Sequence, residues 1–170
     1  MSKKILKADF VFEYVIRDVN LLYWNKRIAA MKKGKKMERY KVILVDDEAE
    51  VIDMIEKKIH WNDLGFEVAG SATNGVKALE LVEKLQPDVV LTDIKMPYMD
   101  GLELSRRLNR EYPNIYIMLC TGFDEFEYAK EAVHLEIKEY MLKPVNATEL
   151  SESLTNLKHT LDREREEKLN

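Results

Sequence analysis

The chain has little of several residue types on which common functional sites depend. It has one cysteine, Cys120, so it cannot form an internal disulfide, and we expect it to work in the reducing cytoplasm. Its three histidines, at positions 60, 134 and 159, lack the spacing of zinc ligands. Its six glycines include no glycine-rich phosphate loop. These absences argue against a disulfide scaffold, a histidine metal centre and a P-loop nucleotide site.

Long hydrophobic runs are missing as well. The longest apolar runs are far too short to cross a bilayer. The early acidic residues Asp9 and Glu13 also prevent a signal-peptide core near the N-terminus. Charged residues make up 34% of the chain and hydrophobic residues 46%, as in soluble globular proteins. We therefore expect no association with a membrane.

The net charge of −4 is unevenly distributed. Residues 1–36 contain ten Lys or Arg and three Asp or Glu, a balance of +7, whereas residues 37–170 contain seventeen and twenty-eight, a balance of −11. An acidic body of this kind is a poor candidate for direct DNA binding. We divide the chain into a basic N-terminal extension (1–38), a main domain (39–162) and a charged helix end or linker (163–170).

The N-terminal extension allows two interpretations. Residues 8–31 have the apolar spacing of an amphipathic helix, which could dock on the domain or on a partner. Alternatively, translation of the native protein begins at Met37, because the preceding Lys-Lys-Gly-Lys-Lys is what a purine-rich ribosome-binding site would encode. We favour the second interpretation as a hypothesis.

From residue 40 onward, short β-rich runs alternate with helical patterns. The expected strands are 40–45, 67–71, 88–92, 115–120 and 139–142. The expected helices are 48–59, 74–86, 102–112, 124–135 and one that runs from 147 towards the C-terminus, with Asn146 as its N-cap. This alternation, with nearly continuous apolar strands, predicts an α/β fold with a parallel sheet covered on both faces.

Five polar residues lie where the predicted strands end. They are Asp46, Asp47, Asp93, Thr121 and Lys143. The carboxyl ends of parallel strands meet at one edge, where such sheets bind their ligands. Any one of these aspartates could be only a turn or a helix cap. Turns or helix caps alone do not easily explain why all five residues lie at strand ends in this order.

The chemistry of this set suits phosphoryl transfer with a divalent cation. Three carboxylates that lie together repel one another, and the hard cation Mg²⁺ relieves the repulsion. A carboxylate beside the metal can attack phosphorus and form an aspartyl phosphate. Lys143 would then place a positive charge near the phosphoryl oxygens, and Thr121 would offer a hydroxyl donor.

Motifs through the main domain carry a resemblance to a known family. They are Val45-Asp46-Asp47-Glu48, the stretch from Asp88 to Pro97, Met99-Asp100-Gly101, Thr121-Gly122 and the stretch from Tyr140 to Pro144. From about Tyr40 to Leu161, the chain resembles a response-regulator receiver domain of two-component signalling. The resemblance implies a flavodoxin-like (βα)5 fold, a doubly wound five-stranded parallel sheet in the order 2-1-3-4-5. The basic N-terminal extension and an extended C-terminal helix would be additions to this fold.

The resemblance also implies roles for the acidic residues. Asp93 would be the phosphoacceptor. Mg²⁺ would bind the carboxylates of Asp46 and Asp47 and the backbone carbonyl of Lys95. The expected function is to accept a phosphoryl group from a sensor histidine kinase, without the turnover of an enzyme.

Further residues would respond to the phosphate. Thr121, Lys143 and Tyr140 match the family's switch residues, and the bond from Lys143 to Pro144 is one that is usually cis in this family. Phosphorylation would then change the surface formed by helix 124–135, strand 139–142 and the last helix. Either that surface or the last helix could form a homodimer.

Two segments, residues 59–66 and 122–129, resemble receivers that precede an AraC-type DNA-binding domain. Such a domain would need roughly a hundred more residues with two helix-turn-helix units. We therefore expect contact with DNA only through a domain outside this sequence. The chain would be a fragment, a truncated gene product, or a stand-alone receiver that acts through protein–protein contacts.

Two other functions fit parts of the pattern. A magnesium-dependent phosphatase of the haloacid-dehalogenase type would carry Asp-x-Asp on its first strand, whereas Asp46 and Asp47 are adjacent. A nucleotide or flavin binder would bring an anionic cofactor to an edge with three carboxylates. Both are disfavoured.

The last helix has leucines at positions 150, 154, 157 and 161, a heptad-like spacing. One interpretation is a helix that packs on the sheet and whose charged end continues into solvent. The other is a dimerising or linker helix.

Overall fold

The computed structural model describes Ala29 and residues 38–122, 126–135 and 137–170. The helix expected over residues 8–31, Ala29 apart, and the basic run after it lie outside the described residues. All elements below belong to the compact unit Arg39–Asn170.

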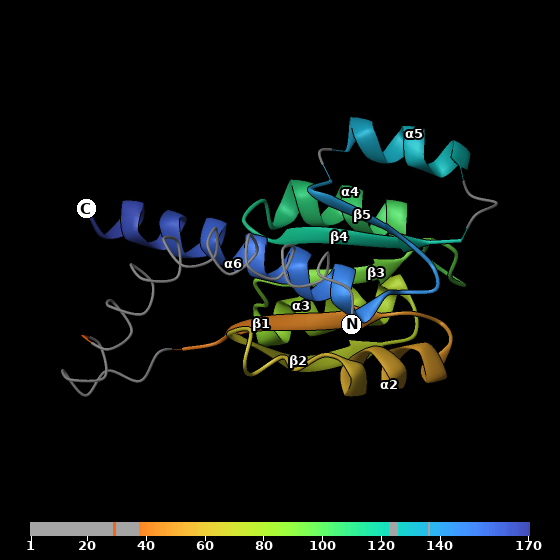
Figure 1. The fold of residues 1–170 in the computed structure, drawn as a ribbon. Helices are drawn as coiled ribbons and strands as arrows, with labels where there is room; N and C mark the ends of the chain where they lie inside the picture. The colour runs from red at the N-terminus through yellow and green to blue at the C-terminus, as the bar shows by residue number, and fades with distance from the viewer. Residues whose placement is uncertain (1–28, 30–37, 123–125, 136) are drawn as a thin grey trace, which may run out of the picture. The chain divides into compact units, whose positions relative to one another are not determined.

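Five strands alternate with five helices in the described part of this unit (Figure 1). The strands are β1 (Tyr40–Val45), β2 (Phe66–Ala72), β3 (Val89–Asp93), β4 (Tyr116–Thr121) and β5 (Glu139–Leu142). The helices are α2 (Ala49–Lys58), α3 (Gly75–Leu85), α4 (Gly101–Glu111), α5 (Phe126–His134) and α6 (Ala147–Leu169). The boundaries agree with the predicted ones to within two residues.

The strands form one parallel sheet in the order β2-β1-β3-β4-β5. This order confirms the predicted flavodoxin-like fold. The register pairs Asp93 with Cys120 and Thr121 with Leu142. The carboxyl ends of the strands therefore share one edge, as the sequence predicts.

Helices cover both faces of the sheet. α2 and α6 lie on one face, and α3 and α4 lie on the other (Figure 1). Each side has its own apolar core. The first core includes Ile52, Ile55, Leu150 and Leu154, and the second includes Val82, Leu104, Leu108 and Leu119. Strands buried on both faces explain why their sequences are nearly continuous in apolar residues.

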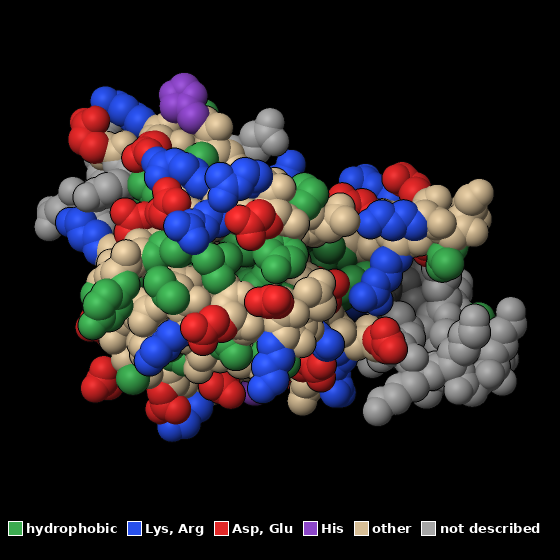
Figure 2. Space-filling model, turned by 180° about the vertical axis from the view of Figure 1, so that it is seen from behind, with side chains coloured by type: hydrophobic (Ala, Val, Ile, Leu, Met, Phe, Trp, Pro, Cys, Tyr) green, Lys and Arg blue, Asp and Glu red, His purple; other side chains and the backbone are tan. Residues whose placement is uncertain are grey.

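Seen from behind in Figure 2, a band of hydrophobic side chains runs between rows of basic and acidic ones. In the described part of the chain, no helix combines the length and the apolar character needed to cross a bilayer.

The leucine seam of α6 is used within the chain. Leu150, Leu154 and Leu161 are buried, and Leu157 packs partly buried against the same core. The Asn146 side chain accepts hydrogen bonds from the first turn of the helix, which confirms the predicted N-cap. A coiled-coil dimer through this seam would have to unpack the core, so these leucines pack on the sheet and not on a second chain.

Candidate functional site

Three carboxylates meet at the carboxyl edge of the sheet. Asp46 follows β1, Asp47 comes next, and Asp93 is the last residue of β3. One carboxylate oxygen from each lies within 4.8 Å of the other two. Asp46 and Asp93 are buried, whereas Asp47 is exposed. The arrangement is an acidic pocket with one side open to solvent.

Lys143, which follows β5, extends its ammonium group into this pocket. Its Nζ lies 2.7 Å from Asp46 Oδ2 and 3.3 Å from Asp93 Oδ2. Burial favours a lower pKa for Lys143, but hydrogen bonding and attraction to Asp46 and Asp93 outweigh it and raise the pKa. Lys143 is therefore charged and offsets part of the repulsion between the two aspartates.

The Asp93 carboxyl remains under electrostatic strain in spite of this partner. Burial, followed by repulsion from Asp46, raises the pKa of Asp93 to about 6, although Lys143 and the backbone N–H of Ile94 act in the opposite direction. The carboxylate is therefore ionised at neutral pH, but at a cost. An added cation would relieve that cost.

Backbone groups fix the orientation of both buried aspartates. The N–H of Glu48 donates to Asp46 Oδ1 at 2.9 Å, and the N–H of Ile94 donates to Asp93 Oδ1 at 2.9 Å. The second oxygen of each carboxylate faces Lys143. These bonds hold the two carboxylates in place before any ligand arrives.

The carboxylate set fits a magnesium ion. Two oxygens bound to one Mg²⁺ lie roughly 3 to 4.2 Å apart, given an octahedron with bonds of about 2.1 Å. The spacing in the pocket is close to this range, so small side-chain rotations would complete the geometry. Oxygen donors with net negative charge are also the chemistry that Mg²⁺ prefers. Lys95 lies two residues after Asp93 and is exposed. Its carbonyl as a further ligand stays a prediction.

The predicted switch residues lie on β4 and β5. Thr121 is fully buried, and its hydroxyl makes a long hydrogen bond of 3.4 Å to the carbonyl of Gly122. Its own carbonyl accepts a hydrogen bond from the N–H of Lys143 at 2.7 Å, so the two residues are neighbours. Tyr140 is half-buried against the second core. The Lys143–Pro144 peptide is cis, the isomer that the resemblance implies.

The sequence interpretation gave no structural role to Gly101, which lies in one of the family motifs and packs against the end of β3. Gly101 donates its N–H to the carbonyl of Ile94 at 2.7 Å, and a Cβ at this position would overlap the backbone carbonyl of Asp93. The loop after β3 can therefore close against the end of β3 only because residue 101 is glycine. The Asp100-Gly101 pair signals a turn in the sequence, but not this close approach.

Comparison with known proteins identifies the family of this domain. The response regulator receiver domain family matches residues 42–155. The chain is 42% identical over 125 residues to the uncharacterized transcriptional regulatory protein YesN of Bacillus subtilis, an alignment that covers 74% of this chain and 34% of YesN. It is 34% identical over 122 residues to the transcriptional regulatory protein HptR of Staphylococcus aureus, covering 72% of this chain and 48% of HptR. The chain thus spans between a third and a half of the length of these relatives.

Solved structures give the same result. The REC domain of AraT, a response regulator from Geobacillus stearothermophilus, is 39% identical with a TM-score of 0.71, covering 74% of this chain and 98% of that domain. A two-component transcriptional regulator AraC from Clostridium phytofermentans is 30% identical with a TM-score of 0.69, with the same coverage of both chains.

The fold and the acidic pocket together define a doubly wound α/β domain of the receiver class. The chain belongs to the response regulator receiver domain family of two-component systems. This confirms the predicted resemblance, including the likeness to receivers of AraC-type regulators.

Proposed function

We propose that this receiver accepts a phosphoryl group onto Asp93 from a sensor histidine kinase, with Mg²⁺ as the cofactor. The observation that supports the proposal most strongly is the convergence of three carboxylates and one ammonium group from β1, β3 and β5 in a single pocket. Asp46, Asp47 and the carbonyl of Lys95 would hold the ion. When bound, Mg²⁺ would neutralise the carboxylates and stabilise charge on the phosphoryl oxygens.

The chain's own residues then account for the transfer. An Asp93 carboxylate oxygen attacks phosphorus, and a P–O bond forms as the P–N bond of the donor phosphohistidine breaks. The donor imidazole keeps the electron pair and takes a proton. Lys143 lies close enough to follow the new negative charge, since its Nζ is already 3.3 Å from Asp93 Oδ2. The transfer modifies Asp93 itself and ends after one phosphoryl group per chain, so we propose a phosphoacceptor and not an enzyme.

Phosphorylation would be read out as a shift between two populations of the domain. The phosphoryl group adds about −1.5 to −2 charges. The hydroxyl of Thr121 and the ammonium of Lys143 would turn to it, and Tyr140 would follow. The surface formed by α5, β5 and α6, in which β5 is the edge strand of the sheet, would then change its conformation. Formation of a homodimer would be one consequence.

The relatives suggest what such a change controls. YesN and HptR are named as transcriptional regulators. We propose that this receiver regulates transcription in the cytoplasm, through a DNA-binding domain in the same or another chain. A stand-alone receiver that acts by protein–protein contact is the alternative. The phosphatase alternative is disfavoured because the candidate nucleophile lies at the end of β3, and the aspartates after β1 are adjacent.

Labelling with radioactive acetyl phosphate tests the proposal. We expect magnesium-dependent, stoichiometric labelling of the wild type and none of Asp93→Asn. Asp100→Asn is the matched control, because it removes a nearby carboxylate while asparagine still caps α4. Persistent labelling of Asp93→Asn would refute the assignment of Asp93. Continuous release of phosphate over many turnovers would instead support a hydrolase.

A further inference from the structure

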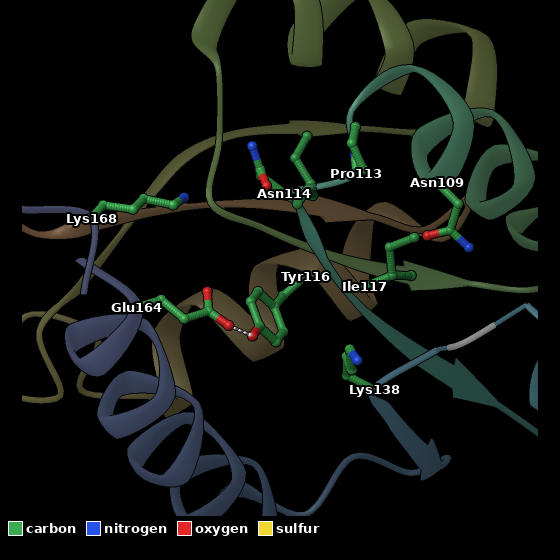
Figure 3. A pocket seen from close by; sticks show the side chains of 9 residues that line it. Asn109, Pro113, Asn114, Tyr116, Ile117, Lys138, Glu164 and Lys168 are labelled. Atoms are coloured by element: carbon green, nitrogen blue, oxygen red, sulfur yellow. Dashed lines mark hydrogen bonds between the residues drawn. The ribbon is translucent and has the colours of Figure 1, made fainter. Parts of the chain in front are cut away.

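The last turns of α6 contact the edge of the sheet where the strands begin, opposite the acidic pocket. The Tyr40 hydroxyl, at the start of β1, donates to Asp162 Oδ1 at 2.6 Å. The Tyr116 hydroxyl, at the start of β4, donates to Glu164 Oε1 at 2.5 Å. Figure 3 shows Tyr116 and Glu164 pointing toward each other across this edge. We call these two contacts the tyrosine–carboxylate pairs.

Cationic side chains reinforce the pairs. Lys158 is buried and its Nζ lies 2.7 Å from Asp162 Oδ2. The guanidinium of Arg165 lies 4.1 Å from the centre of the Tyr40 ring, and one of its nitrogens lies 3.9 Å from an Asp88 carboxylate oxygen. Residues of three successive turns of α6 therefore reach the same strand edge.

Apolar packing does not account for the position of this part of the helix. Leu161 is the last buried residue of α6, and residues 162–170 are half-buried or exposed. Two hollows of about 300 and 430 Å³ adjoin the helix here, and both are lined by Tyr116, Lys138 and Glu164. Figure 3 shows the smaller one. The contacts between residues 162–165 and the sheet are therefore mainly polar.

The hydroxyls of Tyr40 and Tyr116 are hydrogen-bond donors that do not ionise easily. Burial, followed by the hydrogen bond to Glu164, raises the pKa of Tyr116 to about 12. Burial and the bond to Asp162 likewise raise the pKa of Tyr40. Both hydroxyls stay protonated over the physiological range, and the carboxylates accept charge-assisted hydrogen bonds, which are stronger than neutral ones.

We propose that Tyr40 and Tyr116 are positioning residues that fix the direction of the C-terminal part of α6 relative to the sheet. This part of the helix is then a rigid connector and not a solvated tail. The two pairs lie on β1 and β4, whose opposite ends lead to Asp46 and Thr121 in the acidic pocket. Any protein segment joined to α6 thus takes its direction from the strands that form the phosphorylation site. The inference rests on the contacts of α6 and stands whether or not Asp93 is phosphorylated.

Hydrogen–deuterium exchange on the full chain tests the proposal. In the wild type, we expect amides 162–169 to exchange more slowly than in an unstructured peptide. In Tyr40→Phe/Tyr116→Phe, their exchange should become about tenfold faster or more, while β1, β3 and β4 keep their protection. Tyr112→Phe is the control, because Tyr112 lies at the end of α4 beside the second core. It should leave amides 162–169 unchanged.

Because the tyrosines also contact the core, Asp162→Ala/Glu164→Ala provides a second test. It removes the acceptors from the helix side and leaves the sheet intact, and alanine favours the helix. The same increase in exchange is expected. Wild-type protection retained in both double variants would overturn the proposal, as would unprotected amides 162–169 in the wild type.

A distance measurement separates a change of direction from fraying. Spin labels on Glu83→Cys in α3 and Glu167→Cys in α6, both exposed positions, are placed in a Cys120→Ala background. We expect one narrow distance distribution in the wild type and a clearly broader one when both tyrosines become phenylalanine. An unchanged distribution would contradict a positioning role.

Discussion

Asp93 combines two properties that oppose each other in a folded protein. It is buried to 6% exposure, and it carries a charge near another aspartate at neutral pH. Lys143 and two backbone N–H groups make this arrangement possible without removing its cost. A carboxylate held in this way destabilises the metal-free protein, and a bound cation would offset that cost.

This conflict predicts how stability depends on pH. The folded pKa of Asp93, about 6, is above its ordinary value of 3.8, so the folded state binds the proton more tightly. Stability is therefore lost as pH rises from about 4 to about 6, and the cost is constant above that. Asp93→Asn should remove this cost and stabilise the metal-free protein by about 1–3 kcal/mol at pH 7.5. The gain should disappear near pH 4.

Urea unfolding in EDTA at several pH values measures this difference. Asp100→Asn, which replaces a carboxylate at the N-cap of α4, is the control variant. If the difference in unfolding free energy between Asp93→Asn and the wild type were the same at pH 4 and pH 7.5, the burial of Asp93 would not be the cause of the pH dependence.

Among the elements, the loop between β3 and α4 depends most sharply on one residue. Gly101→Ala should place a methyl group against the carbonyl of Asp93, a backbone atom that cannot move away easily. We expect a loss of at least about 2 kcal/mol in the free energy of unfolding, from overpacking next to the site. Gly122→Ala is the matched control in a loop, because its Cβ would meet no atom within 4 Å. Equal stability of the two variants would contradict the close approach at Gly101.

α6 illustrates what its sequence could and could not predict. The spacing of its leucines predicted an apolar face, and Asn146 predicted its start. Spacing alone left two partners open for that face, the sheet or a second chain. Its charged end gave no sign of order, because the acceptors Asp162 and Glu164 find donors about 120 and 48 residues away in sequence. Polar contacts between residues far apart in the sequence produce no periodic pattern from which they could be predicted.

Leu154→Ala measures which partner the leucine face uses. Leu154 is 1% exposed in the first core, so its truncation should cost about 2–5 kcal/mol. Leu169→Ala, at an 86% exposed position on the same helix, should change stability by less than about 0.5 kcal/mol. Thermal or urea unfolding gives both values. A Leu154→Ala variant with unchanged stability and a weakened dimer would point to the second chain instead.

For the whole molecule, the sequence was informative where polar residues recur at the ends of the predicted strands. Five groups at strand ends predicted the pocket because a parallel sheet brings all strand ends together. The sequence could not predict the distances that decide its electrostatics, such as 2.7 Å from Lys143 to Asp46 against 3.3 Å to Asp93. Such distances depend on packing at the Ångström scale, as does the close approach of Gly101.

The position of Lys143 in the pocket predicts a variant that is phosphorylated but does not change its oligomeric state. Lys143→Ala should still accept phosphate from acetyl phosphate, because the proposed nucleophile Asp93 and the carboxylates of Asp46 and Asp47 remain. It should lose the phosphorylation-dependent change in oligomeric state, because the cation that links β5 to the pocket is gone. Analytical ultracentrifugation with and without acetyl phosphate measures this. A response equal to that of the wild type would show that Lys143 is not part of the switch.

The most direct test of the account is to locate the phosphoryl group chemically. The protein is incubated with acetyl phosphate and Mg²⁺, reduced with borohydride to convert an aspartyl phosphate to homoserine, and analysed by peptide mass spectrometry. We predict homoserine at position 93 alone, and none when EDTA replaces Mg²⁺. Homoserine at another aspartate, or no modification in the presence of Mg²⁺, would contradict the account.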